Sequence, residues 1–183
     1  MIQRQPILTE RLLLEPVTPE HVPAIWAATE ASLPELRTWM TWAKQASEAN
    51  SKEFAERAAD DWEAGRDYVF AIMKEGEYLG GVGLHSYRLD GLGELGYWIR
   101  TDRAGQGYTT EAGEALVAFA FDVVKLYRLE LRTGVENHAS QRVAEKLGFR
   151  KEGTLRQGAP LGTEGGYDCY IYGLLAEDRD GSA

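Results

Sequence analysis

A glycine-rich turn over residues 103–112 joins a predicted strand, residues 95–99, to a predicted helix, and it constrains the fold more than any other stretch. The helix shows the apolar stripe of a 3.6-residue period at Ala112, Ala115, Leu116, Phe119, Ala120, Val123 and Val124. The N–H groups of its first turn have no partners within the helix, and they favour an anion, most often phosphate. Gly105 and Gly107 lack the Cβ that would keep a phosphate away from the backbone. A phosphate loop and an ordinary connecting loop both fit this pattern.

Two other phosphate-binding motifs are excluded by the sequence. The chain contains no G-x-x-x-x-G-K-[ST] stretch, so it has no ordinary P-loop. Residues 91–96 match G-x-G-x-x-G letter for letter, but they precede a predicted strand. The dinucleotide-binding motif instead follows a strand and opens a helix, so this match is rejected.

The composition is that of one globular domain of 183 residues, with hydrophobic and charged fractions of 44% and 27% that suit a soluble protein. No apolar run approaches the ~20 residues of a membrane span, and residues 1–6 lack the apolar region of a signal peptide. A single cysteine, Cys169, excludes an internal disulfide and suits a reducing compartment. We therefore expect a cytoplasmic protein with one domain over residues 1–183 and a frayed polar tail over residues 177–183.

The formal net charge of −9 argues against nucleic acid and anionic membranes as partners. The charge fits a cationic substrate, and it equally fits a surface that is acidic for solubility alone. Five carboxylates stand along one predicted helix, where they form either a solvated face or a surface that attracts amines: Glu53, Glu56, Asp60, Asp61 and Glu63.

The first half of the chain predicts one strand, three helices and three further strands. Residues 11–16 form the first strand, which Pro16 ends. Thr18, Ser32 and Ser51 are the expected starts of three helices, the last of which ends at Gly65. Strands are expected next over residues 67–74 and 78–88, and a turn at residues 89–91 leads into the fourth strand, which ends near Arg100. The glycines of residues 80–83 indicate a bulge or a close backbone approach.

The second half predicts a fifth strand over residues 127–135, where apolar and polar residues alternate strictly. Asn137 is the expected N-cap of a helix that stops at Gly148. Two last strands, residues 150–156 and 167–175, flank a loop over residues 158–166. This order predicts a single α+β domain built on a mixed sheet.

Residues 96–99 (Gly-Tyr-Trp-Ile) and 105–112 (Gly-Gln-Gly-Tyr-Thr-Thr-Glu-Ala) resemble the coenzyme A pyrophosphate loop of the GNAT superfamily of N-acetyltransferases, in its RimJ/RimL-like branch. The resemblance continues through residues 137–140 and 146–149, and more weakly from Thr-Glu-Arg-Leu at residues 9–12. The family loop reads [RQ]-x-x-G-x-[GA], whereas this chain has Ala104 and Thr109 at the outer positions. Arg100 and Arg103 are the neighbouring cations that could replace the missing charge.

The resemblance implies a GNAT fold, with a mostly antiparallel sheet that splays between its fourth and fifth strands and is flanked by helices. Acetyl-CoA then lies in that gap, with its pantetheine arm along the backbone of residues 98–100, and no metal takes part. The cofactor-binding residues implied are Trp98, Ile99, Arg100, Arg103, Gly105, Gln106, Gly107, Tyr108, Thr109, Thr110, Asn137, Ser140 and Lys146.

Two residues are the candidates for proton transfer during acetylation of an amine. Glu94 precedes the splayed strand and is the candidate base, the alternative being a solvent-facing carboxylate at a strand start. Ser140 is the candidate acid toward the departing thiolate, the alternative being support of the helix start. His138 is a second candidate near the site, whereas His21 and His85 are interpreted as structural.

Cys169 alternates with strand residues and is interpreted as packing, because no activating base is evident beside it. The aromatic residues that could line an acceptor pocket are Trp26, Trp39, Trp42, Tyr167 and Tyr170. The predicted activity is direct transfer of the acetyl group to a primary amine, either a protein amino terminus or a small cationic amine. A non-catalytic acyl-CoA-binding or interaction module with the same fold is the alternative, and a homodimer stays open because relatives are often dimers.

Overall fold

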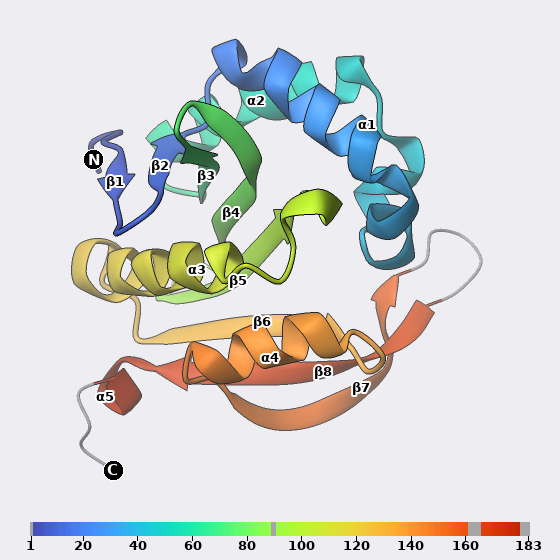
Figure 1. Cartoon of the computed structure of the whole chain (residues 1–183). Coiled ribbons are helices and arrows are strands. Elements are labelled where there is room, and N and C mark those ends of the chain that lie inside the picture. Colours follow the sequence, from blue (N-terminus) through green and yellow to red (C-terminus); the bar gives the residue numbers. More distant parts are fainter. Residues whose placement is uncertain (1, 89–90, 161–165, 180–183) are drawn as a thin grey trace.

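The computed structural model describes residues 2–88, 91–160 and 166–179, and its strands form one eight-stranded sheet (Figure 1). The spatial order is β1-β2-β3-β4-β5-β6-β8-β7, and every neighbouring pair is antiparallel except β5 and β6, which are parallel. The predicted mixed, mostly antiparallel sheet is therefore confirmed. The strands are β1 (Ile7–Leu8), β2 (Leu13–Pro16), β3 (Asp67–Lys74), β4 (Glu77–Arg88), β5 (Leu92–Ile99), β6 (Arg128–Gly134), β7 (Arg150–Pro160) and β8 (Gly166–Leu175).

Helices cover both faces of this sheet (Figure 1). They are α1 (Val22–Trp39), α2 (Glu48–Glu63), α3 (Tyr108–Ala118), α4 (His138–Lys146) and α5 (Ala176–Arg179). A π-helical segment, Phe119–Val124, continues α3, and short 3-10 turns lie at Pro19–His21, Thr41–Gln45 and Thr101–Arg103. Strand alternation sends Phe70 and Ile72 into the core beneath α3 and α4, and Val69 and Ala71 into the core beneath α1 and α2.

The pairing of β5 with β6 stops early, as the resemblance predicts. Parallel pairs join Leu92, Gly93 and Glu94 to residues 128–130, and in the described chain no pair joins the two strands beyond Glu94 and Glu130. Residues 95–99 of β5 stay paired with β4 on their other side. A gap therefore opens between β5 and β6, with α3 beside one edge and α4 beside the other (Figure 1).

The first helical region differs from the prediction. One continuous helix, α1, replaces the two that Thr18 and Ser32 were expected to start. Ser32 is buried inside α1, and its hydroxyl oxygen accepts a hydrogen bond from the backbone N–H of Thr101. Pro34 lies within the helix, where it removes a single intrahelical donor without ending the helix. The expectation of a new helix at Ser32 is wrong. The Ser32 side chain does not cap a helix start; it accepts a hydrogen bond from the backbone of a distant segment.

Three other boundaries also differ. Ser47, not Ser51, is the N-cap of α2, and its Oγ accepts the N–H of Asn50 at 3.1 Å. Residues 158–160 of the expected loop belong to β7, while residues 161–165 of that loop lie outside the described residues. Residues 177–179, expected to fray, lie in α5, in which Asp178 and Arg179 make ion pairs with Arg150 and Asp122.

The two alternatives expected for the glycine run of β4 both occur in the structure. The β3–β4 register shifts between Ile72 and Met73, opposite Tyr78 and Gly80, which is a bulge. A Cβ on Gly80 would lie 2.2 Å from the carbonyl oxygen of Trp98, so the backbones of β4 and β5 approach closely there.

We predict that Gly80→Ala destabilises the fold by about 1–3 kcal/mol, because the added methyl meets backbone that cannot rotate away. Urea unfolding of the variant measures this. Gly153→Ala is the matched control, since a Cβ at Gly153 meets nothing within 4 Å. Equal stabilities for the two variants would contradict the close approach.

Candidate active site

The turn before α3 presents a cluster of unbonded backbone donors. Gly105 and Gly107 have φ of +75° and +84°, the left-handed conformations that glycine adopts without strain. Within the described chain, none of the N–H groups of residues 105–110 has a hydrogen-bond acceptor, and the first bond of the helix runs from Glu111 N–H to the carbonyl of Gly107. Six donors at the positive end of a helix form a site suited to a phosphate or pyrophosphate.

The N-terminal segment holds this turn in place through Glu111 and Arg11. The Glu111 carboxylate accepts hydrogen bonds from the Thr9 hydroxyl at 2.6 Å, the Arg11 N–H at 2.8 Å and the Arg11 Nε at 2.6 Å. Arg11 also donates to the Gln106 carbonyl at 3.2 Å and lies over the ring of Tyr108. The Thr-Glu-Arg-Leu stretch of residues 9–12 therefore fixes the loop from a position almost 100 residues away in the sequence.

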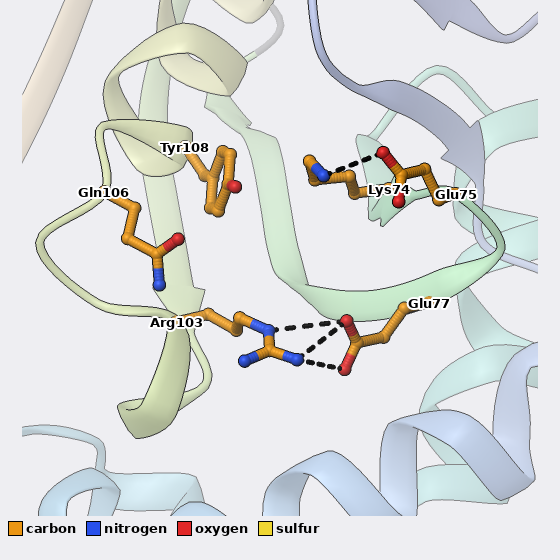
Figure 2. A pocket seen from close by; sticks show the side chains of 6 residues that line it. All are labelled: Lys74, Glu75, Glu77, Arg103, Gln106 and Tyr108. Carbon is orange, nitrogen blue, oxygen red and sulfur yellow. Dashed lines mark hydrogen bonds and ion pairs between the residues drawn. The ribbon is translucent and has the colours of Figure 1, made fainter.

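A cavity of about 360 Å³ lies beside the loop (Figure 2). Its lining residues are Lys74, Glu75, Glu77, Arg103, Gln106 and Tyr108. Two cations reach it, but both are already paired: Lys74 with Glu75 at 3.0 Å, and Arg103 with both oxygens of Glu77 at 3.0 Å (Figure 2).

Arg100 is also paired, which changes the expected charge of the site. Its guanidinium bonds Glu77 at 2.6 Å and Asp102 at 2.9 Å. The hydrogen bond from Arg103 is the main cause that holds the pKa of Glu77 below its usual range. An entering anion must therefore compete with Glu77 for Arg103. The donors that are open to an anion are the backbone N–H groups of residues 105–110.

Glu94 lies where β5 and β6 part, paired with Glu130 across the last parallel position. Its side chain is 28% exposed, and Arg132 Nε lies 3.8 Å from its carboxylate. Burial raises the pKa of Glu94 above the usual range of a glutamate, and Arg132 opposes this shift. A carboxylate with a raised pKa at the mouth of the gap accepts a proton more readily than one in water.

Ser140 lies in the first turn of α4, next to β5. Asn137 caps this helix as predicted, because its Oδ1 accepts the N–H of Ser140 at 3.1 Å. The Tyr97 hydroxyl lies 2.9 Å from Ser140 Oγ and 3.1 Å from the Ser140 carbonyl oxygen. Burial raises the pKa of Tyr97 to about 12, so its phenol stays protonated at neutral pH. The two hydroxyls form a linked pair of donors between β5 and α4.

Four of the five aromatic residues expected at an acceptor pocket fall into two groups. Trp39, at the end of α1, and Tyr167 both lie over Gly134 of β6. A Cβ atom added to Gly134 would lie 3.0 Å from each of the two rings. Trp42 packs edge-on against Trp98 of β5, with ring centroids 5.9 Å apart. These four rings line both sides of the gap on the α1 face, whereas Tyr170 packs against the core of the opposite face.

The remaining predicted residues lie away from these contacts. Lys146 is exposed in the last turn of α4, at the opposite end of the helix from Ser140. His138 is exposed, with Glu136 at 4.0 Å. Cys169 is buried, and burial raises the pKa of its thiol, which does not suit a nucleophile. Among the described residues there is no group of three His, Cys, Asp or Glu that could hold a metal ion, and no helix is long and apolar enough to cross a membrane.

Comparison with known proteins identifies the architecture. The family model described as acetyltransferase (GNAT) domain matches residues 11–150, most of the chain. This chain belongs to the GNAT family of acetyltransferases. The ribosomal-protein-serine acetyltransferase of Escherichia coli (strain K12) is 27% identical over 152 residues, which cover 82% of this chain and 85% of that relative.

Solved GNAT structures share the fold at low identity. RimL, a ribosomal L7/L12 alpha-N-protein acetyltransferase in complex with coenzyme A, superposes with a TM-score of 0.89 at 20% identity, covering 95% of this chain and 99% of RimL. The microcin C7 self-immunity acetyltransferase MccE, in complex with acetyl-CoA and AMP, gives 0.85 at 20% identity, covering 91% and 93%. The GNAT assignment supports an acetyl-CoA-dependent N-acetyltransferase rather than the non-catalytic alternative.

Sequence reasoning did not predict three features of the structure beside this candidate site. Tyr97 alternates with Leu95 and Ile99, which predicts its face but not its contact with Ser140. Lys74 lines the cavity from the neighbouring hairpin and carries no motif. Thr133, in the part of β6 that leaves β5, is buried, and its hydroxyl has no hydrogen-bond partner among the described residues.

We predict that Glu111→Gln destabilises this GNAT domain by about 1–3 kcal/mol at pH 7, because charge-assisted hydrogen bonds to Thr9 and Arg11 are weakened. Burial alone would raise the pKa of Glu111, but these hydrogen bonds outweigh it and hold the pKa below the usual range. The stabilisation is therefore present above the unfolded-state pKa of about 4.3 and is lost as pH falls through the lower folded-state pKa.

Urea unfolding of both proteins at pH 7 and at successively lower pH measures this difference, which should shrink in acid. Glu114→Gln, an exposed position of the same helix, is the matched control and should leave stability unchanged. A difference that persists in acid would contradict the role of the Glu111 charge.

Proposed function

We propose that this GNAT enzyme transfers the acetyl group of acetyl-CoA directly to the amino-terminal amine of a protein, of the kind that ribosomal-protein acetyltransferases modify. The observation that carries the proposal is the end of β5–β6 pairing at Glu94 and Glu130, beside the unbonded N–H groups of residues 105–110. The names of the relatives, a ribosomal-protein-serine acetyltransferase and RimL, support the acceptor class.

On the donor side, the pyrophosphate of acetyl-CoA would bind the N–H groups of residues 105–110, and its pantetheine arm would lie along β5 near residues 98–100. The thioester would then reach Tyr97 and Ser140, whose linked hydroxyls stand between β5 and α4. Arg103 would exchange Glu77 for a phosphate oxygen, so the missing family cation at Ala104 would be replaced by its neighbour.

On the acceptor side, the amine would enter from the α1 face between the aromatic groups of Trp39 and Trp42 and meet Glu94. Glu94 would accept the proton of the incoming ammonium. The freed nitrogen would then attack the thioester carbon, and the C–S bond would break as the N–C bond forms. Ser140, linked to Tyr97, would donate a proton to the departing thiolate.

The carboxylates of α2 are poorly placed to steer a small cationic amine into the gap, so a protein amino terminus fits this arrangement better as the acceptor. Glu56 and Asp61 of α2 are paired with Lys52 and Arg57, and α2 packs on β3 rather than lining the gap. The net charge of −9 favours basic protein acceptors in general. Because the buried thiol of Cys169 is free, a reducing cytoplasm is the compartment proposed.

We expect the enzyme to add one acetyl group to the α-amine of a basic peptide that begins with serine. Mass spectrometry of the peptide, with and without acetyl-CoA, detects the product. The same peptide with its amino terminus already blocked is the control, and spermidine tests the small-amine alternative. Coenzyme A binding without transfer to either acceptor would contradict the proposal and favour a binding module.

We also predict that Ser140→Ala lowers kcat by ~10²-fold, in the range of general acid catalysis, while the KM for acetyl-CoA changes little. Tyr97→Phe should lower kcat by a smaller factor, because Ser140 keeps its own hydroxyl. Steady-state kinetics with the acceptor peptide measure both. Tyr127→Phe, an exposed tyrosine, is the control, and a kcat near wild type in Ser140→Ala would leave Ser140 with its helix-start role alone.

A further inference from the structure

The register of the sheet brings four titratable side chains together across four strands. Asp67 of β3 pairs with His85 of β4, His85 with Glu94 of β5, and Glu94 with Glu130 of β6. Directly opposed residues project to the same face, with Cβ atoms about 5 Å apart. These four residues, here called the titratable row, lie on the α1 and α2 face and reach the point where β5 and β6 part.

The His85 ring is held in one orientation. Its Nδ1 lies 2.9 Å from Asp67 Oδ2. Its Nε2 lies over Gly83 and Gly96, which pair directly with each other across β4 and β5. A Cβ atom added to Gly83 or to Gly96 would lie 3.1 or 3.3 Å from this nitrogen. Any larger residue at these two positions would displace the ring. The glycines thus leave room for an imidazole that lies along the sheet on the side of the acceptor.

The side chains of the titratable row are partly exposed, so a proton on the row can pass to solvent. His85 and Asp67 are each about one-third exposed, and Glu94 only slightly less. The helices that cover this face contribute apolar side chains, among them Ile25 of α1 and Ala58 of α2. The charged groups described around His85 include Asp67, Glu94 and, beyond Glu94, Glu130 and Arg132.

We propose that His85, oriented by Asp67, takes the proton that Glu94 removes from the acceptor amine and passes it to solvent. The O–H bond on Glu94 breaks as an N–H bond forms at Nε2, directly or through one water. The imidazolium, stabilised by the Asp67 carboxylate, then releases the proton to bulk water. Glu94 returns to its charged form for the next turnover, so His85 acts through Glu94 and does not touch the acceptor. The inference rests on the proposed function.

Coupling within the row can be measured without any turnover. NMR titration of the His85 imidazole should give a lower midpoint in Glu94→Gln than in wild type, because a neighbouring carboxylate stabilises the imidazolium. Asp67→Asn should lower it as well. His21, which bonds Glu15 and Thr18 elsewhere in the fold, is the internal control and should titrate unchanged. An unchanged His85 midpoint in Glu94→Gln would overturn the coupling.

Turnover then tests the relay itself. His85→Ala should lower kcat by about tenfold or more with the acetyl-CoA KM unchanged, and added imidazole should restore the rate. In a Glu94→Gln background the same change should have little further effect, because both residues serve one proton path. A wild-type kcat in His85→Ala, or a loss that imidazole does not restore, would overturn the relay. Failure of the wild-type enzyme to acetylate any acceptor would instead count against the proposed function.

Discussion

The structure depends on where the parallel pairing of β5 and β6 ends. Up to Glu94 and Glu130 the two strands are one sheet, and beyond them each keeps a partner on its outer side alone. Since β5 stays anchored to β4, and β6 to β8, the gap is held open from both sides. The donor site, the aromatic rings of the acceptor side and the candidate base are all defined by their position along that gap.

Strand alternation then separates the two halves of the chemistry. Tyr97 faces α4 and meets Ser140, where the leaving thiolate would need a proton. Glu94 projects from the opposite face of β5 and belongs to the titratable row that includes His85. Under the proposed function, acetyl-CoA and the acceptor amine would therefore approach from opposite faces and meet at one opening. The Arg11–Glu111 contacts complete the site by fixing the donor loop relative to the sheet.

Patterns local in sequence predicted the fold well, and contacts between distant segments were the part they missed. The strict alternation of β6 and the stripe of α3 were sufficient to place those elements, and Gly105 and Gly107 have positive φ in the turn before α3. Ser32 was misread because its partner, the N–H of Thr101, is 69 residues away. The pairing of Arg103 with Glu77, and the alignment of His85 with Glu94, follow from sheet register, which composition and spacing do not reveal.

The most direct test of the central claim, that the gap and its loop bind the cofactor, is a titration of the isotope-labelled protein with coenzyme A followed by amide NMR. The account predicts saturable shifts in the amides of residues 105–110, whose N–H groups gain acceptors, and in residues 95–99 of β5. Gly153, on the outer strand β7, should not move. No saturable change in the loop, or shifts confined to another surface, would contradict the account.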